Sequence, residues 1–263
     1  MADPADTSRS SGASSPPTVG TRPPGATDER SAARAVRQMF DQIAPRYDLL
    51  NHVLSMNVDR LWWRRTARIF ARILSRNDAR VLDLCAGTGD MSVALQAVAA
   101  KKKSNAAILA LDFSRPMLQH GLTKYRARKI QPLEADALQL PLADNTVDLV
   151  VSAFGFRNLA NYDAGLYEIF RVLKPGGEAG ILDFSEPGGF MGKFYGFYFR
   201  RVLPRIGAVI SGVRSAYEYL PASVQKFPAP QEMLDRMAAA GFTEGNWLPY
   251  TFGIAGLYRA KKP

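Results

Sequence analysis

This 263-residue chain is poor in cysteine and has no long apolar run. Cys85 is its only cysteine, so no internal disulfide can form, and a reducing compartment is the natural setting. No stretch reaches the eighteen or so consecutive apolar residues that are needed to cross a bilayer. We therefore expect a cytoplasmic protein that is either soluble or rests on a membrane surface without crossing it.

Apolar residues are also scarce in the first thirty or so positions, where serine and proline are frequent. Such a segment has little to bury, so we predict a disordered arm over residues 1–33. Acids in this segment disfavour an organelle transit peptide, and it lacks the apolar core of a secretory signal. The segment has four acids and three basic residues, so the rest of the chain, with 31 basic and 20 acidic residues, carries a formal net charge of +11. This surplus is compatible with nucleic acid, an anionic membrane surface or solubility alone.

Strand and helix patterns alternate from residue 80 onward. The predicted strands are 80–85, 106–112, 130–134, 147–153 and 178–184, with two further strand-like runs near the end; the predicted helices are 34–43, 58–74, 90–99, 114–128, 161–172 and 231–240. This alternation predicts an α/β fold with a doubly wound, mostly parallel sheet that binds its ligands at the carboxyl ends of the strands.

The chain is predicted to form one catalytic domain over residues 34–263. Two parts of this domain stand outside the alternation of strands and helices. Residues 34–75 precede the first strand, and we expect them to form a helical lid. Residues 187–227 interrupt the alternation, and we expect them to be an insertion that binds the substrate.

The first strand ends in a glycine-bearing turn, with Gly87 and Gly89 on either side of Thr88. Such a turn leaves backbone N–H groups exposed at a helix N-terminus, where a ligand can approach closely. The third glycine of a dinucleotide fingerprint is missing, because Ser92 stands at its position. The turn instead resembles the D-x-G-x-G-x-G motif of S-adenosylmethionine-dependent methyltransferases, which begins here at Asp83.

Acids also follow the next two strands of the predicted sheet. Asp112 ends the second strand, where a carboxylate can accept hydrogen bonds from both ribose hydroxyls of an adenosyl group. Asp136 follows the third strand, where it can accept from the adenine amino group. A single acid at a strand end is often merely solvated, but three strand ends in succession carry one. The sequence therefore predicts S-adenosyl-L-methionine as the cofactor.

The residues at the end of the fourth predicted strand indicate which class of methyl acceptor the protein uses. Enzymes that methylate exocyclic base amines need an amide followed by Pro-Pro-aromatic there, and a C5 mechanism needs a second cysteine; this chain has neither. A nucleic-acid methyltransferase, the rival hypothesis, is then favoured by net charge alone. The segment Ala153–Asn158 instead resembles the F-G-x-R-N of the ubiquinone/menaquinone biosynthesis C-methyltransferases. Residues 47–55, 171–177 and 217–220 match further signatures of that family, and the resemblance covers about residues 36–258.

The resemblance implies S-adenosylmethionine-dependent C-methylation of a polyprenylated quinol. We expect demethylmenaquinol as the acceptor, with 2-methoxy-6-polyprenyl-1,4-benzoquinol as the alternative. The predicted cofactor-binding residues are Asp83, Gly87, Thr88, Asp112, Asp136 and Ala137. The chain departs from the family pattern at Leu50, Asp59, Ala153 and Asp183, where the family usually has Met, His, Ser and Glu, and at Cys85, which replaces the first glycine of the motif.

The chemistry of the reaction suggests roles for three further residues. An aromatic carbon is a poor nucleophile until a ring hydroxyl loses its proton, and a fixed cation nearby lowers the pKa of that hydroxyl. Arg157 is the candidate cation, and Asn158 is the candidate for holding the same oxygen. Tyr47, together with Asp48 and His52, is the candidate for passing the proton outward. No metal site is predicted.

The remaining expectations concern partners. The segment 190–201 has six aromatic residues and three cations in twelve positions, which suits the headgroup level of an anionic membrane. A helix packed over the sheet edge is the alternative interpretation. Because a prenyl tail is insoluble in water, we expect peripheral association with the inner face of the membrane. A homo-oligomer or a complex of quinone-biosynthesis enzymes is compatible with the sequence, and nucleic acid is not an expected partner.

Overall fold

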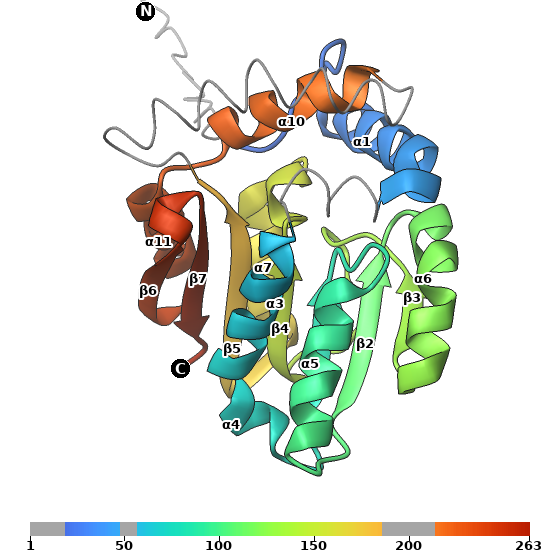
Figure 1. Ribbon diagram of the computed structural model, residues 1–263. Helices are drawn as coiled ribbons and strands as arrows, with labels where there is room; N and C mark the ends of the chain where they lie inside the picture. Colours follow the sequence, from blue (N-terminus) through green and yellow to red (C-terminus); the bar gives the residue numbers. More distant parts are fainter. Residues whose placement is uncertain (1–18, 48–56, 186–213) are drawn as a thin grey trace, which may run out of the picture.

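The protein, seen here as a computed structural model, is described over residues 19–47, 57–185 and 214–263 (Figure 1). Its strands are β1 (Arg80–Leu84), β2 (Ala107–Asp112), β3 (Gln131–Glu134), β4 (Val147–Ala153), β5 (Leu173–Phe184), β6 (Thr243–Tyr250) and β7 (Ala255–Lys261). They form one sheet in the order β3-β2-β1-β4-β5-β7-β6. The first five strands run parallel, and β7 is antiparallel to both of its neighbours. The predicted mostly parallel α/β fold is confirmed.

Helices cover both faces of this sheet (Figure 1). They are α1 (Glu29–Ile43), α3 (Val58–Ile69), α4 (Ala71–Leu74), α5 (Asp90–Lys101), α6 (Arg115–Arg128), α7 (Tyr162–Val172), α10 (Arg214–Lys226) and α11 (Pro230–Ala239), with 3₁₀ turns η1 (Ala44–Arg46), η2 (Phe156–Asn158) and η4 (Thr251–Gly253). The α3–α6 layer packs on one face and the α7 and α11 layer on the other. Figure 1 shows α1 and α10 crossing above the carboxyl ends of the parallel strands.

Burial explains why the central strands were readable from the sequence. In β1 only Arg80 is exposed, and β4 is buried from Val147 to Ser152. Strands that are covered on both faces have continuous apolar runs, so their bounds are predicted within one residue. β5 begins earlier than predicted, at Leu173, because the chain pairs with Val147 before a register shift next to Leu149.

The N-terminal boundary of the folded part differs from the prediction. Helix α1 begins at Glu29, and Asp28 and Ser31 form a reciprocal capping box at its start. Thr21 is only 2% exposed, and its backbone N–H donates to the carbonyl of Leu159 at 2.8 Å. The predicted disorder over 1–33 therefore does not extend to residues 19–33. Residues 1–18 lie outside the described part of the chain.

Only part of the predicted lid lies above the sheet edge. α1 is tied there by hydrogen bonds from Ser114 to Asp41, at 2.5 Å, and from Arg37 to Glu134, at 2.5 Å. α3 and α4 instead belong to a layer on the sheet face, because their apolar side chains are part of the core. The predicted insertion overlaps α10 over 214–226, and its residues 187–213 lie outside the described part. No helix among the described residues is long and apolar enough to cross a membrane.

Two buried tyrosines give a test of the core. The hydroxyl of Tyr258 is buried without a hydrogen-bond partner in the described part of the chain, whereas that of Tyr250 lies 3.1 Å from the Thr66 hydroxyl. We expect Tyr258→Phe to leave the free energy of unfolding unchanged or to raise it by about 1 kcal/mol, because an unsatisfied group is removed. Tyr250→Phe should lower it by about 1 kcal/mol. Denaturant unfolding measures both, and a larger loss in Tyr258→Phe would contradict this assignment.

Candidate active site

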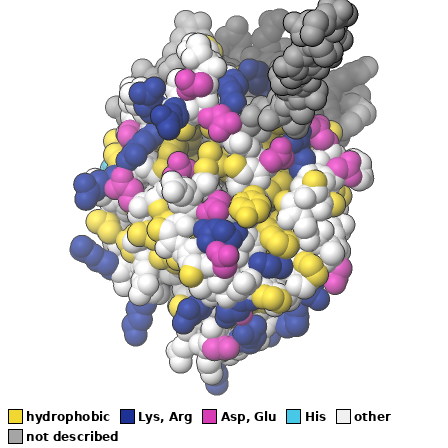
Figure 2. Space-filling model, turned by 180° about the vertical axis from the view of Figure 1, so that it is seen from behind, with side chains coloured by type: hydrophobic (Ala, Val, Ile, Leu, Met, Phe, Trp, Pro, Cys, Tyr) yellow, Lys and Arg dark blue, Asp and Glu magenta, His cyan; other side chains and the backbone are white. Residues whose placement is uncertain are grey.

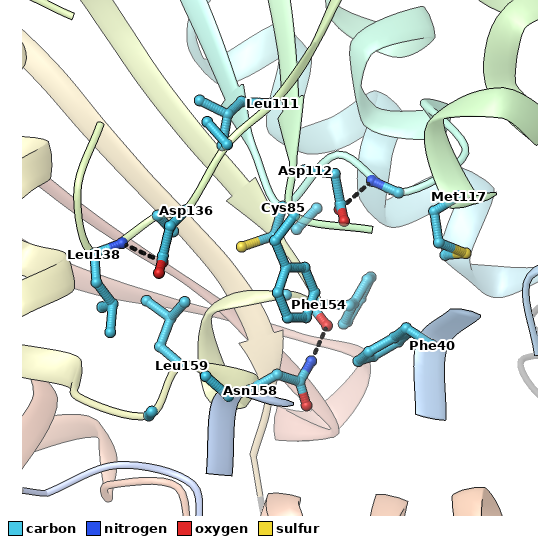
Figure 3. Close-up of a pocket in the computed structure, with 18 of the residues that line it drawn as sticks. Phe40, Cys85, Leu111, Asp112, Met117, Asp136, Leu138, Phe154, Asn158 and Leu159 are labelled. Carbon is cyan, nitrogen blue, oxygen red and sulfur yellow. Dashed lines mark hydrogen bonds between the residues drawn. The ribbon is translucent and has the colours of Figure 1, made fainter. Parts of the chain in front are cut away.

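A pocket opens at the carboxyl ends of β1, β2 and β4, next to α1 (Figure 3). It encloses about 680 Å³, part of which is open to solvent. Its lining residues are Ala33, Phe40, Tyr47, Cys85, Gly87, Leu111, Asp112, Phe113, Met117, Ala135, Asp136, Ala137, Leu138, Ala153, Phe154, Gly155, Asn158, Leu159 and Ala160. Asp112 and Asp136 are the only charged groups among these, so the pocket suits a mostly apolar ligand with a few fixed polar contacts.

The turn after β1 forms one wall of the pocket. Gly87 and Gly89 have φ angles of 57° and 89°, which favour glycine. A Cβ at Gly89 would lie 2.3 Å from the ring of Tyr125, so this position excludes any side chain. A Cβ at Gly87 would project between Met117 and Tyr47, both of which line the pocket, at 3.2 and 3.9 Å. The missing side chain therefore leaves room for a ligand beside the backbone.

Cys85 takes the same left-handed conformation, with a φ of 58°. Glycine adopts this conformation freely, whereas other residues lose roughly 1–2 kcal/mol. The position therefore favours the glycine that the methyltransferase motif has there. Burial raises the pKa of the Cys85 thiol well above its ordinary value, so the thiol stays protonated. We assign Cys85 to packing at the pocket wall, without a chemical role.

Asp112 fixes the turn to the tip of β2. One of its carboxylate oxygens accepts the backbone N–H of Gly87 at 2.8 Å, and the other accepts that of Ser114 at 2.9 Å. Each oxygen retains a lone pair, so the carboxylate can still accept two hydroxyl groups from a ligand in the pocket. Burial raises the pKa of Asp112 to about 6, against the opposing effect of these N–H donors.

The other predicted cofactor residues fall into two groups. Gly87, Asp136 and Ala137 line the pocket with Asp112, and Figure 3 shows the Asp136 carboxylate held by the backbone N–H of Leu138, at 2.9 Å. Asp83 and Thr88 are not among the lining residues. Asp83 lies behind the turn, fully buried, and accepts a hydrogen bond from the Ser92 hydroxyl in the first turn of α5. Burial raises the pKa of Asp83 to about 7.

Asn158, in η2, lines the pocket, and a chain of hydrogen bonds holds its side chain. Its side-chain oxygen accepts the hydroxyl of Tyr219 at 3.0 Å. Since this tyrosine has a single proton to donate, the hydroxyl of Thr21, 2.7 Å away, must donate to it in turn. The Asn158 amide nitrogen faces the Phe154 carbonyl at 3.5 Å (Figure 3). One amide N–H of Asn158 therefore remains for a ligand, and Tyr219 occupies one of the two acceptor positions of its oxygen.

Arg157 is buried behind the pocket wall and does not line it. Its guanidinium donates to Asp183 at 2.9 Å and to the Phe154 carbonyl, and its backbone N–H donates to the second Asp183 oxygen at 3.0 Å. Burial is the largest single effect and lowers the pKa of Arg157, but the charge of Asp183, the phenols of Tyr47 and Tyr219 and the hydrogen bond to Asp183 together raise it above its ordinary value. The arginine is therefore a permanent cation that is largely neutralised by its partner.

Tyr47 is the third predicted catalytic residue, and it lines the pocket at the end of η1. Its ring lies 6.1 Å from that of Phe40, edge to face. Asp48 and His52, the predicted partners of Tyr47 in proton transfer, lie outside the described residues.

Two functional residues escaped the sequence reasoning. Tyr219 belongs to a stretch that matched the family pattern, so a signal was present, but nothing local indicated its bond to Asn158. Thr21 gave no signal, because it lies in the segment predicted to be disordered.

Comparison with known proteins shows which family this chain belongs to. The family model described as the ubiE/COQ5 methyltransferase family matches residues 26–262. The chain belongs to this family. It is 44% identical over 248 residues to a protein of Deinococcus radiodurans named demethylmenaquinone methyltransferase, covering 93% of this chain and 99% of that one. A Thermus thermophilus protein of the same name is 46% identical, over 86% of this chain and all of the relative.

Solved structures agree on the fold. A Thermotoga maritima structure described as a SAM-dependent methyltransferase, possibly acting on histamine, superposes with a TM-score of 0.59 at 18% identity, over 87% of this chain and all of that one. The [4+2]-cyclase SpnF reaches a TM-score of 0.64 at 17% identity, over 94% and 99% of the two chains. At these identities the likeness shows the fold alone, whereas the family match shows that this protein is an S-adenosyl-L-methionine-dependent methyltransferase.

Cofactor binding should depend on the ionisation of Asp112. Only the carboxylate form accepts two ribose hydroxyls, so the affinity should be constant above the pKa of about 6 and fall below it. Calorimetry should show an S-adenosylmethionine dissociation constant that rises about tenfold from about pH 7 to about pH 5. Asp112→Ala should weaken binding at least tenfold at neutral pH, since hydrogen bonds to a charged group contribute ~1.5–3 kcal/mol each.

Two asparagine variants separate the buried acids. Asp112→Asn should bind weakly with no pH dependence, whereas Asp83→Asn should keep the pH dependence of the parent. Loss of the pH dependence in Asp83→Asn instead would identify Asp83 as the titrating group.

Tyr219 should position Asn158 for the methyl acceptor. Tyr219→Phe removes the donor to the Asn158 oxygen, so the amide is free to rotate in the pocket. We expect kcat/KM for the acceptor to fall about tenfold while S-adenosylmethionine affinity stays unchanged. Thr21→Val should have a smaller effect of the same kind. Tyr250→Phe serves as the control, because Tyr250 makes a similar hydrogen bond but does not line the pocket. An equal loss of kcat/KM in that variant would show that the effect of Tyr219→Phe comes from lost stability.

Proposed function

We propose that this protein methylates a ring carbon of a demethylated polyprenyl naphthoquinol, demethylmenaquinol, in menaquinone biosynthesis. The observation that carries the reaction type is the orientation of the Asn158 amide, which Tyr219 fixes and which keeps one N–H donor for a ligand in a largely apolar pocket. Such a donor suits the oxygen of a quinol next to the carbon that is methylated. The names of the Deinococcus and Thermus relatives support the naphthoquinol.

The pocket residues have different roles in the proposed reaction. S-adenosyl-L-methionine, when bound, supplies an electrophilic methyl group. Asp112 and the open backbone at Gly87 are placed to hold it, and Asp136 and Ala137 extend the same wall. The apolar lining excludes water, and orienting the two reactants in such a site can contribute ~7–11 kcal/mol.

The acceptor must become a phenolate, since deprotonation raises the electron density on the ring carbons. The remaining N–H of Asn158 stabilises the negative oxygen, and Arg157 adds a weaker field because Asp183 neutralises most of its charge. Tyr47 lines the same pocket and is the candidate to receive or relay the proton. We assign catalytic contact to Asn158 and Tyr47, and we place Arg157 one layer behind them.

Other acceptors are outcomes of the same test. The 44% identical Geobacter sulfurreducens relative is named ubiquinone/menaquinone biosynthesis C-methyltransferase UbiE, which supports the benzoquinol as the second candidate. An RNA or DNA methyltransferase is favoured by net charge alone.

The proposal includes partners beyond the quinol. Helix α1 above the pocket fits the role of a lid, and α10 fits part of the substrate-binding insertion. We also propose association with an anionic membrane at the inner face, because the acceptor carries a lipid tail. The aromatic and basic segment 190–201, which the sequence suggests for this contact, lies outside the described residues. A homo-oligomer or a quinone-biosynthesis complex is a further possibility that the sequence allows.

A direct assay separates these acceptors. The protein is incubated with S-adenosylmethionine labelled in its methyl group and with chemically reduced demethylmenaquinol, reduced demethylated benzoquinol or total RNA. We expect label in the naphthoquinol, none in its oxidised quinone form, and less or none in the others. Label in RNA, or equal methylation of quinone and quinol, would overturn the proposal.

Arg157 gives a prediction that distinguishes catalysis from stability. Arg157→Ala should keep S-adenosylmethionine affinity but reduce turnover only about tenfold, because the field that Arg157 adds is weak, and it should also lower stability by about 3–5 kcal/mol because Asp183 is left buried and unpaired. The double variant Arg157→Leu/Asp183→Leu removes both charges and should recover much of the stability. Turnover is then compared at equal folded fraction. A stable double variant with normal turnover would show that the ion pair is structural only.

A further inference from the structure

The exposed face of α3 is unusual in its charge. Residues 57–72 contain five arginines and a single acid, Asp59, which is only 3% exposed. Arg64 and Arg68 are exposed and form no ion pair with any acid in the described parts of the chain, and Arg65 lies over the ring of Tyr250 at 4.2 Å. By contrast, Figure 2 shows basic and acidic side chains interspersed on the back of the molecule.

An apolar residue shares this face with the arginines. Leu61 is 60% exposed and precedes Arg64, Arg65 and Arg68 by three, four and seven positions, so all four project from one side of the helix. The opposite side of α3 is buried in the core. Leu61 therefore lies on the side of α3 that faces away from the core.

A second apolar side chain is held outward by a strained turn. Phe252 in η4 is 79% exposed and has a φ of 57°, next to Thr251 with a φ of 46°. Left-handed conformations of such bulky residues are uncommon and require firm support. The support is present, since Trp62 donates its indole N–H to the Thr251 hydroxyl at 2.8 Å and the Ser185 hydroxyl donates to the Gly253 carbonyl at 2.7 Å.

These two features adjoin each other and the pocket. The Trp62–Thr251 bond joins η4 to the N-terminal half of α3. The ring of Trp62 in turn lies 5.7 Å from that of Phe154, which lines the pocket. We call the surface of Leu61, Arg64, Arg65, Arg68 and Phe252 the α3 corner. Phe252 lies at the carboxyl ends of the parallel strands, and the arginines follow α3 along the face of the sheet (Figure 1).

We propose that the α3 corner docks on an anionic lipid bilayer, with its arginines at the headgroups and Phe252 and Leu61 in the interface below them. A lipid surface is favoured over nucleic acid because it buries both apolar side chains, whereas a leucine has no ring on which a base can stack. The position next to the pocket wall suits an acceptor with a lipid tail. In this respect the inference rests on the proposed function, although its test measures binding without turnover.

The test is sedimentation of the full chain with vesicles. Phosphatidylcholine vesicles are compared with vesicles that also contain phosphatidylglycerol, at low and high salt. We expect binding only to the anionic vesicles, weakened by salt. Arg64→Glu/Arg68→Glu should weaken it at least twentyfold, since each basic residue near an anionic surface contributes roughly fivefold. Arg126→Glu/Arg128→Glu, the same charge change in exposed positions of α6, should bind nearly like the parent.

Phe252→Ser tests insertion apart from charge. It leaves the net charge unchanged and should still weaken vesicle binding several-fold, while thermal melting confirms folding. Equal losses in the α3 and α6 variants would show diffuse electrostatics and overturn the proposal. So would normal vesicle binding in Arg64→Glu/Arg68→Glu, or binding of the parent to RNA and not to vesicles.

Activity measurements keep this inference separate from the proposed function. Arg64→Glu/Arg68→Glu should methylate a short-tailed, detergent-soluble quinol at the parent rate and lose activity only on quinol in vesicles. If the parent binds vesicles through the α3 corner but methylates no quinol, the docking surface stands and the proposed function fails. If activity on both quinols falls equally in the variant, the α3 corner supports the fold or the pocket and the docking proposal fails.

Discussion

The hydrogen bond from the Gly87 N–H to the Asp112 carboxylate is the contact on which the pocket depends. It joins the turn after β1 to the tip of β2, and the Tyr125 hydroxyl donates to the Gly87 carbonyl at 2.9 Å from the other side. Held in this way, Gly87 keeps a left-handed conformation with no side chain between Met117 and Tyr47. The same carboxylate that braces the turn is also the group that we propose to accept the ribose hydroxyls, so one residue would serve both structure and binding.

The acceptor side of the pocket depends on contacts made over a much longer range. The Tyr219 hydroxyl reaches Asn158 from α10, and Thr21 completes the chain of hydrogen bonds from a segment that precedes the first helix. These contacts fix the orientation of the Asn158 amide in the pocket. Helix α10 and the segment before α1, both outside the sheet, thus orient a side chain that follows β4.

The sequence predicts the sheet, the glycine turn and the acids at the strand ends, because each is encoded in short runs of neighbouring residues. It also identifies Gly87, Asp112, Asp136, Ala137, Asn158 and Tyr47, all of which line one pocket. It does not predict that Arg157 is paired with Asp183, 26 positions away, since nothing local in either strand end indicates the other. Nor does the sequence predict that Asp83 lies outside the pocket lining. Asp83 and Asp112 each lie at or near the end of an apolar strand, and this pattern does not show which of them faces the pocket.

The proposed methylation of a naphthoquinol ring would leave a direct trace in the quinone pool of the cell. In cells from which the gene has been deleted, mass spectrometry should show menaquinone replaced by a naphthoquinone one methyl group lighter. The gene should restore menaquinone, whereas an Asp112→Ala copy should restore much less. An unchanged menaquinone pool, or accumulation of a demethylated benzoquinone instead, would contradict the proposed methylation.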